Sequence, residues 1–126
     1  MEPLISIVDD DIFFQNYISA FLRQHNFNRV ISYSTGEMCL ANIDKRPDLI
    51  ILDHDMNGLS GTGVLKEMNR QANVFDVIMV SSRDDEDLIQ SVVKLGVKKY
   101  IKKDNELQKN LKEYFSNINS HKVSIT

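Results

Sequence analysis

Acidic, hydroxyl and lysine side chains follow four apolar runs of this sequence. Directly after the runs 4–8, 48–52, 77–80 and 99–101 come, in turn, Asp9 and Asp10, Asp53, Ser81, and Lys102 and Lys103. Carboxylates brought close together repel one another unless a cation lies among them, and a set of oxygen ligands suits Mg²⁺. A hydroxyl and an ammonium group are donors for an anion beside that metal, and phosphate is the obvious candidate. These residue types therefore predict a magnesium site that handles a phosphoryl group.

This prediction rests on the combination of acidic, hydroxyl and lysine residues, because each residue alone is weak evidence for a site. An Asp or Ser at the end of a strand is most often a helix cap or a turn residue. A single lysine such as Lys103 is most often a solvated surface charge. Here, however, every candidate follows the carboxyl end of an apolar run, and none precedes one.

The pattern of apolar residues predicts the elements that must position these side chains. Strands are expected at 4–8, 29–33, 48–52, 77–80 and 99–101. The first helix is expected at 12–25, and a Ser34–Glu37 capping box should open the second. The other helices are expected around 64–69, between the acidic cluster 84–87 and Gly96, and at 105–118. Strands alternating with helices over short connections indicate a doubly wound five-stranded parallel sheet with helices on both faces. Ligands of such α/β folds bind beyond the carboxyl ends of the strands, where the candidate residues fall.

Length and composition indicate one ordinary globular domain. The 126 residues are 42% hydrophobic and 26% charged, and we expect a domain over 1–120 with a short loose tail at 121–126. No run approaches the roughly 20 apolar residues that span a bilayer. The start has no basic region or cleavage site of a signal peptide, so a cytoplasmic location without membrane contact is expected.

Charge and cysteine content exclude two further kinds of site. The net charge of -3 argues against nonspecific nucleic-acid binding, which needs a basic face. Cys39 is the only cysteine, so the chain has neither an internal disulfide nor a cysteine-based zinc site. We expect Cys39 to be a small buried hydrophobic residue.

Four segments resemble the motifs of bacterial response-regulator receiver domains, the CheY-like family of two-component signalling. The segments are Ile7–Asp11, Leu49–Asp53, Val80–Ser82 and Tyr100–Lys103, and the resemblance extends over nearly the whole chain. It implies the flavodoxin-like strand order 2-1-3-4-5. We also expect a single-domain form, because the chain ends soon after the last expected helix.

The resemblance implies a role for each candidate. Asp53 matches the phosphoacceptor, Ser81 and Tyr100 match the switch residues, and Lys103 matches the lysine of the site. The magnesium ligands would be Asp10, Asp53, the backbone carbonyl of Asp55, and Asp9 acting through water. For Tyr100, a half-buried strand aromatic with its hydroxyl in water is an equally good interpretation.

The implied activity is a phosphorylation switch. Asp53 would take a phosphoryl group, with Mg²⁺ as cofactor, from a sensor histidine kinase or a histidine phosphotransfer protein. Phosphorylation would remodel the face of the fourth helix, fifth strand and fifth helix, which would bind a downstream protein target. The chain would catalyse only its own phosphorylation and dephosphorylation, and so would not be an enzyme in the usual sense.

Two positions depart from the family pattern, which usually has proline there. Asn57 stands after the phosphoacceptor, so we expect a looser loop, and Asn57 itself tolerates positive φ. Asp104 follows Lys103, and a cis bond before a non-proline residue costs about 2.5–4 kcal/mol. We therefore expect a trans Lys103–Asp104 bond, with Lys103 still reaching Asp53 through its flexible stem. Asp104, or Asn105 with Gln108 as a capping-box partner, could cap the last helix.

The resemblance also places Asp55 and Arg83 on either side of the access to the phosphoryl group. We expect the two side chains to face each other as an ion pair that slows loss of the phosphoryl group.

Two alternatives stay open. Asp53-His54-Asp55 resembles the nucleophile-x-acid motif of haloacid-dehalogenase phosphohydrolases, although those enzymes carry it on their first strand. The chain could instead be a degenerate receiver that acts only as an interaction module.

Overall fold

The computed structural model describes the backbone of residues 2–125 and the side chains of residues 2–117. Within this range strands and helices alternate along the chain. The elements are β1 (Leu4–Val8), α1 (Ile12–Gln24), β2 (Arg29–Tyr33), α2 (Gly36–Ala41), the 3-10 helix η1 (Ile43–Lys45), β3 (Leu49–Leu52), α3 (Gly61–Arg70), β4 (Val77–Ser81), α4 (Glu86–Lys94), β5 (Lys99–Lys102) and α5 (Leu107–Ile125). The strands lie in the order β2-β1-β3-β4-β5, and all neighbours are parallel. The expected doubly wound sheet and its flavodoxin-like order are confirmed.

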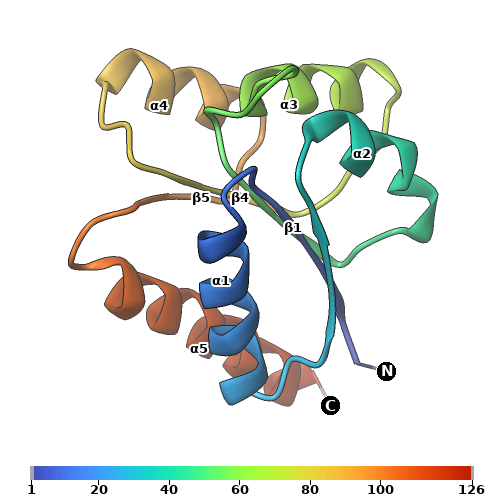
Figure 1. Ribbon diagram of the computed structural model, residues 1–126. Helices are drawn as coiled ribbons and strands as arrows, with labels where there is room; N and C mark the ends of the chain where they lie inside the picture. The colour runs from blue at the N-terminus through green and yellow to red at the C-terminus, as the bar shows by residue number, and fades with distance from the viewer. Residues whose placement is uncertain (1, 126) are drawn as a thin grey trace.

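Helices cover both faces of the sheet. Helices α1 and α5 lie on one face, and α2, α3 and α4 lie on the other (Figure 1). Successive residues of a strand point to opposite faces. Accordingly, Ile7 and Ile51 belong to the apolar core under α1 and α5, whereas Val8 and Leu52 belong to the core on the other face. Burial on both sides explains why β3 is a continuous apolar run and why β1 is apolar except for the buried Ser6. The expected burial of Cys39 is also confirmed.

The register of the strands determines which residues meet beyond their carboxyl ends. Val8 at the end of β1 lies opposite Leu52 at the end of β3. Ser81 at the end of β4 lies opposite Lys102 at the end of β5. Because all strands point the same way, the residues that follow β1, β3, β4 and β5 reach the same edge of the sheet.

The beginning of α2 corrects one prediction. Thr35, rather than Ser34, is the N-cap, because its hydroxyl accepts a hydrogen bond of 3.1 Å from the N–H of Met38. Glu37, predicted as the second member of a capping box, instead accepts the N–H of Leu59, outside its own helix.

Helices α1 and α3 also begin at side-chain caps. Asp11 accepts the N–H of Phe13 at the start of α1, over 2.9 Å. Ser60 accepts the N–H of Gly63 over 3.2 Å. Helix α3 therefore begins at Gly61, earlier than the predicted Val64.

Helix α4 has the expected ends. Asp85 occupies the N-cap position, but its carboxylate binds Arg83 instead of capping the helix. Asp84 binds Lys102 over 2.9 Å, so Lys102 points to the surface. Gly96 ends the helix with φ of 107°, in the left-handed region that favours glycine.

Helix α5 is shifted and longer than predicted. It begins at Leu107 because Asp104 accepts the N–H of Glu106 over 2.9 Å with its side chain and that of Leu107 over 3.1 Å with its carbonyl. It continues to Ile125, since no glycine or proline interrupts residues 107–125. The tail expected to be loose is thus helical up to Ile125, while the domain boundary at residue 120 stays a prediction. The side chain of Ile118, predicted on the apolar face, and residue 126 of the tail lie outside the described residues. In the part of the chain that is described, no helix is long and apolar enough to cross a membrane.

Candidate functional site

Three carboxylates meet at the carboxyl edge of the sheet. Asp9 and Asp10 follow β1, Asp53 follows β3, and one carboxylate oxygen of each lies within 4.8 Å of the others. Neighbouring strands hold their backbone: the N–H of Asp9 donates to Tyr33 over 3.1 Å, and the N–H of Asp53 donates to Val8 over 2.9 Å. Asp9 and Asp53 are buried, whereas Asp10 is exposed. The structure thus brings together the three side chains predicted to bind magnesium, at a place open to solvent on one side.

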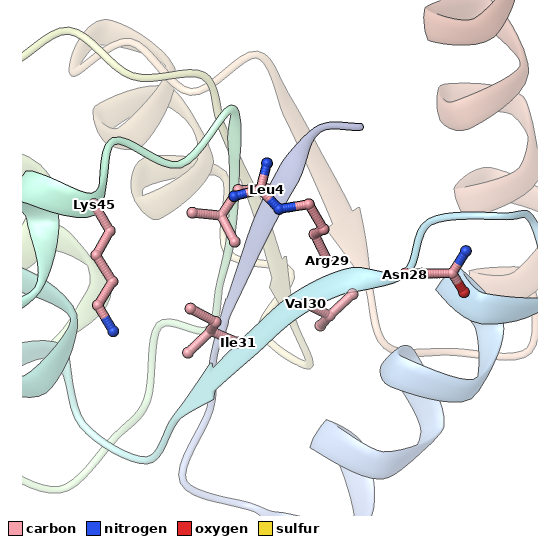
Figure 2. A pocket seen from close by; sticks show the side chains of 6 residues that line it. All are labelled: Leu4, Asn28, Arg29, Val30, Ile31 and Lys45. Atoms are coloured by element: carbon pink, nitrogen blue, oxygen red, sulfur yellow. The ribbon is translucent and has the colours of Figure 1, made fainter. Parts of the chain in front are cut away.

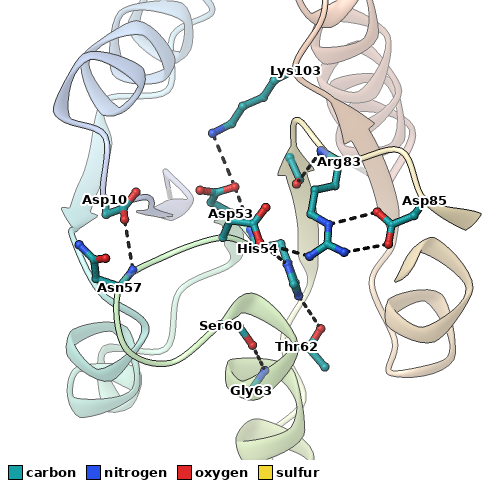
Figure 3. Close-up of polar contacts among 12 residues, drawn as sticks. Asp10, Asp53, His54, Asn57, Ser60, Thr62, Gly63, Arg83, Asp85 and Lys103 are labelled. Atoms are coloured by element: carbon teal, nitrogen blue, oxygen red, sulfur yellow. Dashed lines mark hydrogen bonds and ion pairs between the residues drawn. The ribbon is translucent and has the colours of Figure 1, made fainter. Parts of the chain in front are cut away.

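Lys103 reaches this cluster from the end of β5. Its Nζ lies 2.8 Å from Asp9 Oδ2. It also lies 3.6 Å from Asp53 Oδ1 (Figure 3). The Lys103–Asp104 peptide bond is trans. The N–H of Lys103 donates to the carbonyl of Ser81 over 2.8 Å, which connects the lysine to β4. Both parts of the prediction for Lys103 are therefore confirmed.

Burial raises the pKa of Asp53 to about 6, because little water reaches its carboxylate. The ammonium of Lys103 opposes this shift, the charges of Asp9 and Asp10 add to it, and a hydrogen bond of 2.8 Å from the N–H of His54 opposes it. A divalent cation among the three carboxylates would compensate their repulsion and favour ionised Asp53. Because every candidate ligand is an oxygen, this donor set fits Mg²⁺.

His54 anchors the segment between Asp53 and α3. Its ring Nδ1 lies 3.1 Å from Asp55 Oδ1, and its Nε2 lies 3.0 Å from the hydroxyl of Thr62 in the first turn of α3 (Figure 3). Gly61 donates its N–H to the carbonyl of His54 over 2.9 Å. A Cβ at Gly61 would lie 2.5 Å from the carbonyl oxygen of Asp53, so α3 can begin this close to the site only with glycine.

Arg83 faces Asp55 across the ends of β3 and β4, as predicted. The guanidinium Nη1 lies 3.4 Å from Asp55 Oδ1, and two further hydrogen bonds of 3.1 and 2.9 Å connect Arg83 to Asp85 (Figure 3). These side chains are largely exposed, so the ion pair is confirmed as a surface contact. The backbone carbonyl of Asp55 as a metal ligand stays a prediction.

Both proposed switch residues contact the backbone of Arg83. Its N–H donates to the hydroxyl oxygen of Ser81 over 3.2 Å, and its carbonyl accepts the hydroxyl of Tyr100 over 2.7 Å. Ser81 is fully buried, and Tyr100 is half-buried, with its pKa raised mainly by that burial. The hydroxyl of Tyr100 therefore has a protein partner, whereas one of the two sequence interpretations left it in water.

The loop between β3 and α3 is held in place, although the missing proline predicted a looser one. Asn57 donates its N–H to Asp10 over 3.2 Å, and Leu59 donates its N–H to the Glu37 carboxylate over 3.2 Å. Gly58, not Asn57, has the positive φ, at 78°. Side chains from α2 and from the acidic cluster thus fasten this loop without proline.

The sequence patterns did not identify Gln15 as a residue that supports the site. Its amide is buried and donates to the carbonyl of Asp9 over 2.5 Å, so it supports the backbone of the acidic pair. Tyr17, predicted on the buried face of α1, is 42% exposed instead. A polar residue three positions before the buried Ile18, within the apolar stripe of a helix, was the signal that could have identified Gln15.

A hollow lies at the opposite edge of the sheet from the acidic cluster. It has a volume of about 460 Å³, and Figure 2 shows the side chains around it, those of Leu4, Asn28, Arg29, Val30, Ile31 and Lys45. Leu4 and Arg29 begin β1 and β2, so this hollow lies at the amino ends of these strands, away from Asp53.

The chain is similar to curated bacterial signalling proteins over part of their length. It is 33% identical over 102 residues to the sensory transduction protein RegX3 of Mycobacterium tuberculosis, a match that covers 79% of this chain and 43% of that protein. It is 33% identical over 91 residues to the alkaline phosphatase synthesis transcriptional regulatory protein PhoP of Bacillus subtilis, covering 68% of this chain and 36% of that one. The chain therefore spans less than half the length of these relatives.

Solved structures and a family model agree with these relatives. The N-terminal domain of an uncharacterized protein from Wolinella succinogenes has a TM-score of 0.84 at 26% identity, covering 98% of this chain and 99% of that one. Chemotaxis protein CheY4 of Vibrio cholerae has a TM-score of 0.80 at 22% identity, covering 92% and 98%, which shows the shared fold. The model of the response regulator receiver domain matches residues 5–115. With an acidic cluster and a lysine at the edge of a 2-1-3-4-5 sheet, the chain belongs to the response regulator receiver domains of two-component systems.

Proposed function

We propose that Asp53 accepts a phosphoryl group from a phosphohistidine of a sensor histidine kinase or a histidine phosphotransfer protein. The observation that carries the proposal is the meeting of three carboxylates with the ammonium of Lys103 at one edge of the sheet. A carboxylate oxygen of Asp53 attacks phosphorus, the P–N bond to the donor imidazole breaks, and its electron pair leaves with the imidazole. An ionised carboxylate is itself the nucleophile, so the chain needs no additional base.

The other residues of the site position this reaction and offset charge. Lys103 lies beside Asp53 and would compensate negative charge on the transferred oxygens. The N–H of His54 fixes the orientation of the Asp53 carboxylate. Asp9, Asp10, Asp53 and the backbone carbonyl of Asp55 are the groups that would hold Mg²⁺, which neutralises phosphoryl charge when bound.

Phosphorylation would act as a switch through Ser81 and Tyr100. The phosphoryl group adds acceptor oxygens beside Asp53. In the proposed response, the Ser81 hydroxyl turns to one of these oxygens and gives up the N–H of Arg83. Tyr100 then leaves the Arg83 carbonyl and turns toward the vacated space. These movements would remodel the face made by α4, β5 and α5, where a downstream protein target would bind.

The proposed partners are proteins on both sides of the switch. The relatives are named for sensory transduction and transcriptional regulation, and for this chain we propose a histidine-containing donor and a protein target. Neither nucleic acid nor a membrane is a proposed partner, and the cytoplasmic location stays a prediction. In this proposal the chain catalyses only the gain and loss of its own phosphoryl group.

Intact mass spectrometry after treatment with acetyl phosphate and Mg²⁺ tests the proposal. We expect the mass of one phosphoryl group to be added to the wild type and none to Asp53→Asn. Asp11→Asn is a matched control, because asparagine also caps a helix and Asp11 caps α1. This control should be labelled like the wild type. Labelled Asp53→Asn would show that another residue is the acceptor.

The two alternatives make different predictions, the hydrolase in a turnover assay and the degenerate receiver in the mass measurement. A phosphohydrolase would release phosphate steadily from small phosphate esters, whereas a receiver stops at one labelled Asp per chain. Nothing in the site favours the hydrolase, because Asp55, the acid of its motif, is paired with His54 and Arg83. A degenerate receiver would remain unlabelled.

A further inference from the structure

We propose that Phe14 is a positioning residue for Lys103 and that its ring face holds the ammonium group between Asp9 and Asp53. This inference rests on the proposed function of Asp53 and extends it to a residue of α1. Phe14 lies in the first turn of α1, directly before Gln15, which holds the carbonyl of Asp9. Adjacent residues of one helical turn would thus position both the lysine and its acidic partner.

The geometry is that of a cation–π contact. Lys103 Nζ lies 4.0 Å from the centroid of the Phe14 ring, well within the roughly 6 Å over which such contacts are attractive. The ring is half-buried and packs against the apolar core under α1 and α5, so its position is defined. The Lys103 side chain is only 20% exposed, and a poorly hydrated ammonium is attracted more strongly to a ring face.

The two carboxylates alone would not determine where the ammonium lies. Asp9 is at hydrogen-bonding distance, 2.8 Å, whereas Asp53 is at 3.6 Å, too far for a good hydrogen bond. Lysine has a flexible stem, so its head could follow Asp9 and move away from Asp53. The ring of Phe14 provides a third contact, which restrains that movement before any phosphoryl group arrives.

This chain has a particular need for such a contact. Asp104 follows the lysine, the bond between them is trans, and Asp104 is occupied at the start of α5 through Glu106. The backbone after Lys103 therefore turns into the start of α5, where Asp104 caps the helix. A side-chain contact from α1 can hold the ammonium in position independently of the path of this backbone.

A substitution that changes the charge distribution of the Phe14 ring but not its size separates the positioning role of the ring from its packing. A phenylalanine trifluorinated on the ring keeps nearly the same volume but loses the negative ring face. With this residue at position 14, we expect labelling by acetyl phosphate to slow roughly three- to tenfold, while the protein stays folded and unfolds as cooperatively as the wild type. Phe14→Leu should slow labelling similarly, and Phe14→Trp should retain the wild-type rate. The matched control is the same fluorinated residue at Phe13, which is 82% exposed and should have no effect.

A second measurement does not depend on phosphorylation. In the unphosphorylated wild type, the ring current of Phe14 should shift the NMR signals of the Lys103 ε-protons upfield, and Phe14→Leu should remove the shift. Wild-type ε-protons without an upfield shift would overturn the positioning role, even if Asp53 is labelled normally. Equal labelling rates for the fluorinated and natural rings would also overturn it. An unlabelled wild type that shows the shift would instead reject the proposed function while supporting the contact.

Discussion

At the scale of single residues, the chemistry of the site follows from how little water reaches Asp53. Its folded pKa of about 6 lies above the ordinary value of 3.8, mainly because of burial. The folded state therefore binds the proton more tightly than the unfolded state does. The stability contributed by the protonated carboxyl is fully present below about pH 3.8 and is lost as the pH rises through 6.

We therefore predict that Asp53→Asn is more stable than the wild type at pH 7 in EDTA. The gain in the free energy of unfolding should be up to about 3 kcal/mol, because the amide stays neutral where the carboxylate is charged. The gain should shrink as the pH is lowered from 6 to 4. Urea unfolding of both proteins across this range measures it, and a gain that does not change with pH would contradict the prediction.

The buried amide of Gln15 leads to a second prediction at this scale. Gln15→Leu should lower the free energy of unfolding by about 1–3 kcal/mol, because the carbonyl of Asp9 loses a buried donor. Gln24→Leu is the control, since Gln24 is exposed near the end of the same helix and should change stability little. Equal stability of the two variants in urea unfolding would rule out the assigned role of Gln15.

At the scale of elements, we expect the connection from β4 to α4 to control access to Asp53. Arg83 joins this connection to the one after β3 through Asp55, and to the start of α4 through Asp85. We predict that Arg83→Ala loses its phosphoryl group about two- to fivefold faster, because water then reaches the site more easily. The measurement is the decay of labelled protein after acetyl phosphate is removed.

A control for this experiment breaks a similar exposed ion pair elsewhere. Arg70 pairs with Glu67 on α3, so Arg70→Ala should leave the decay rate unchanged. A phosphoryl lifetime in Arg83→Ala equal to or longer than in the wild type would reject the gating role.

At the scale of the whole molecule, magnesium binding should stabilise the fold. A ligand that binds only the folded state at 100 times its dissociation constant adds about 2.7 kcal/mol to the free energy of unfolding. We predict that Mg²⁺ raises the thermal midpoint of the wild type and that EDTA reverses the change. Asp10→Ala should lose this response, since it removes a predicted ligand of the ion.

Asp11→Ala distinguishes loss of the metal from general destabilisation. Asp11 caps α1, so its replacement should lower the starting stability by about 1 kcal/mol but keep the response to Mg²⁺. A full magnesium response in Asp10→Ala would show that Asp10 is not a ligand. The midpoints are read from thermal unfolding at fixed protein concentration.

The order of the elements, and the edge of the sheet at which the site lies, could be predicted from the amino-acid sequence. Short apolar runs such as Leu49–Leu52, which alternate with helical patterns, indicate strands buried on both faces, and parallel strands place Asp9, Asp53 and Ser81 at one edge. Local patterns were less reliable at helix ends. The Ser34 and Thr35 hydroxyls are equivalent as caps in the sequence, and only the backbone geometry selects Thr35.

The side chains that surround and support the acidic cluster became clear only from the packing of the elements. Gln15 and Glu37 form their hydrogen bonds with residues outside their own helices, Asp9 and Leu59, so a local pattern can mark Gln15 as unusual but cannot identify either partner. The same holds for the ring of Phe14, which meets an ammonium 89 positions further along the chain, at Lys103. Such contacts depend on how α1 and α2 pack against the sheet, because a side chain's partner is set by packing between elements and not by sequence spacing.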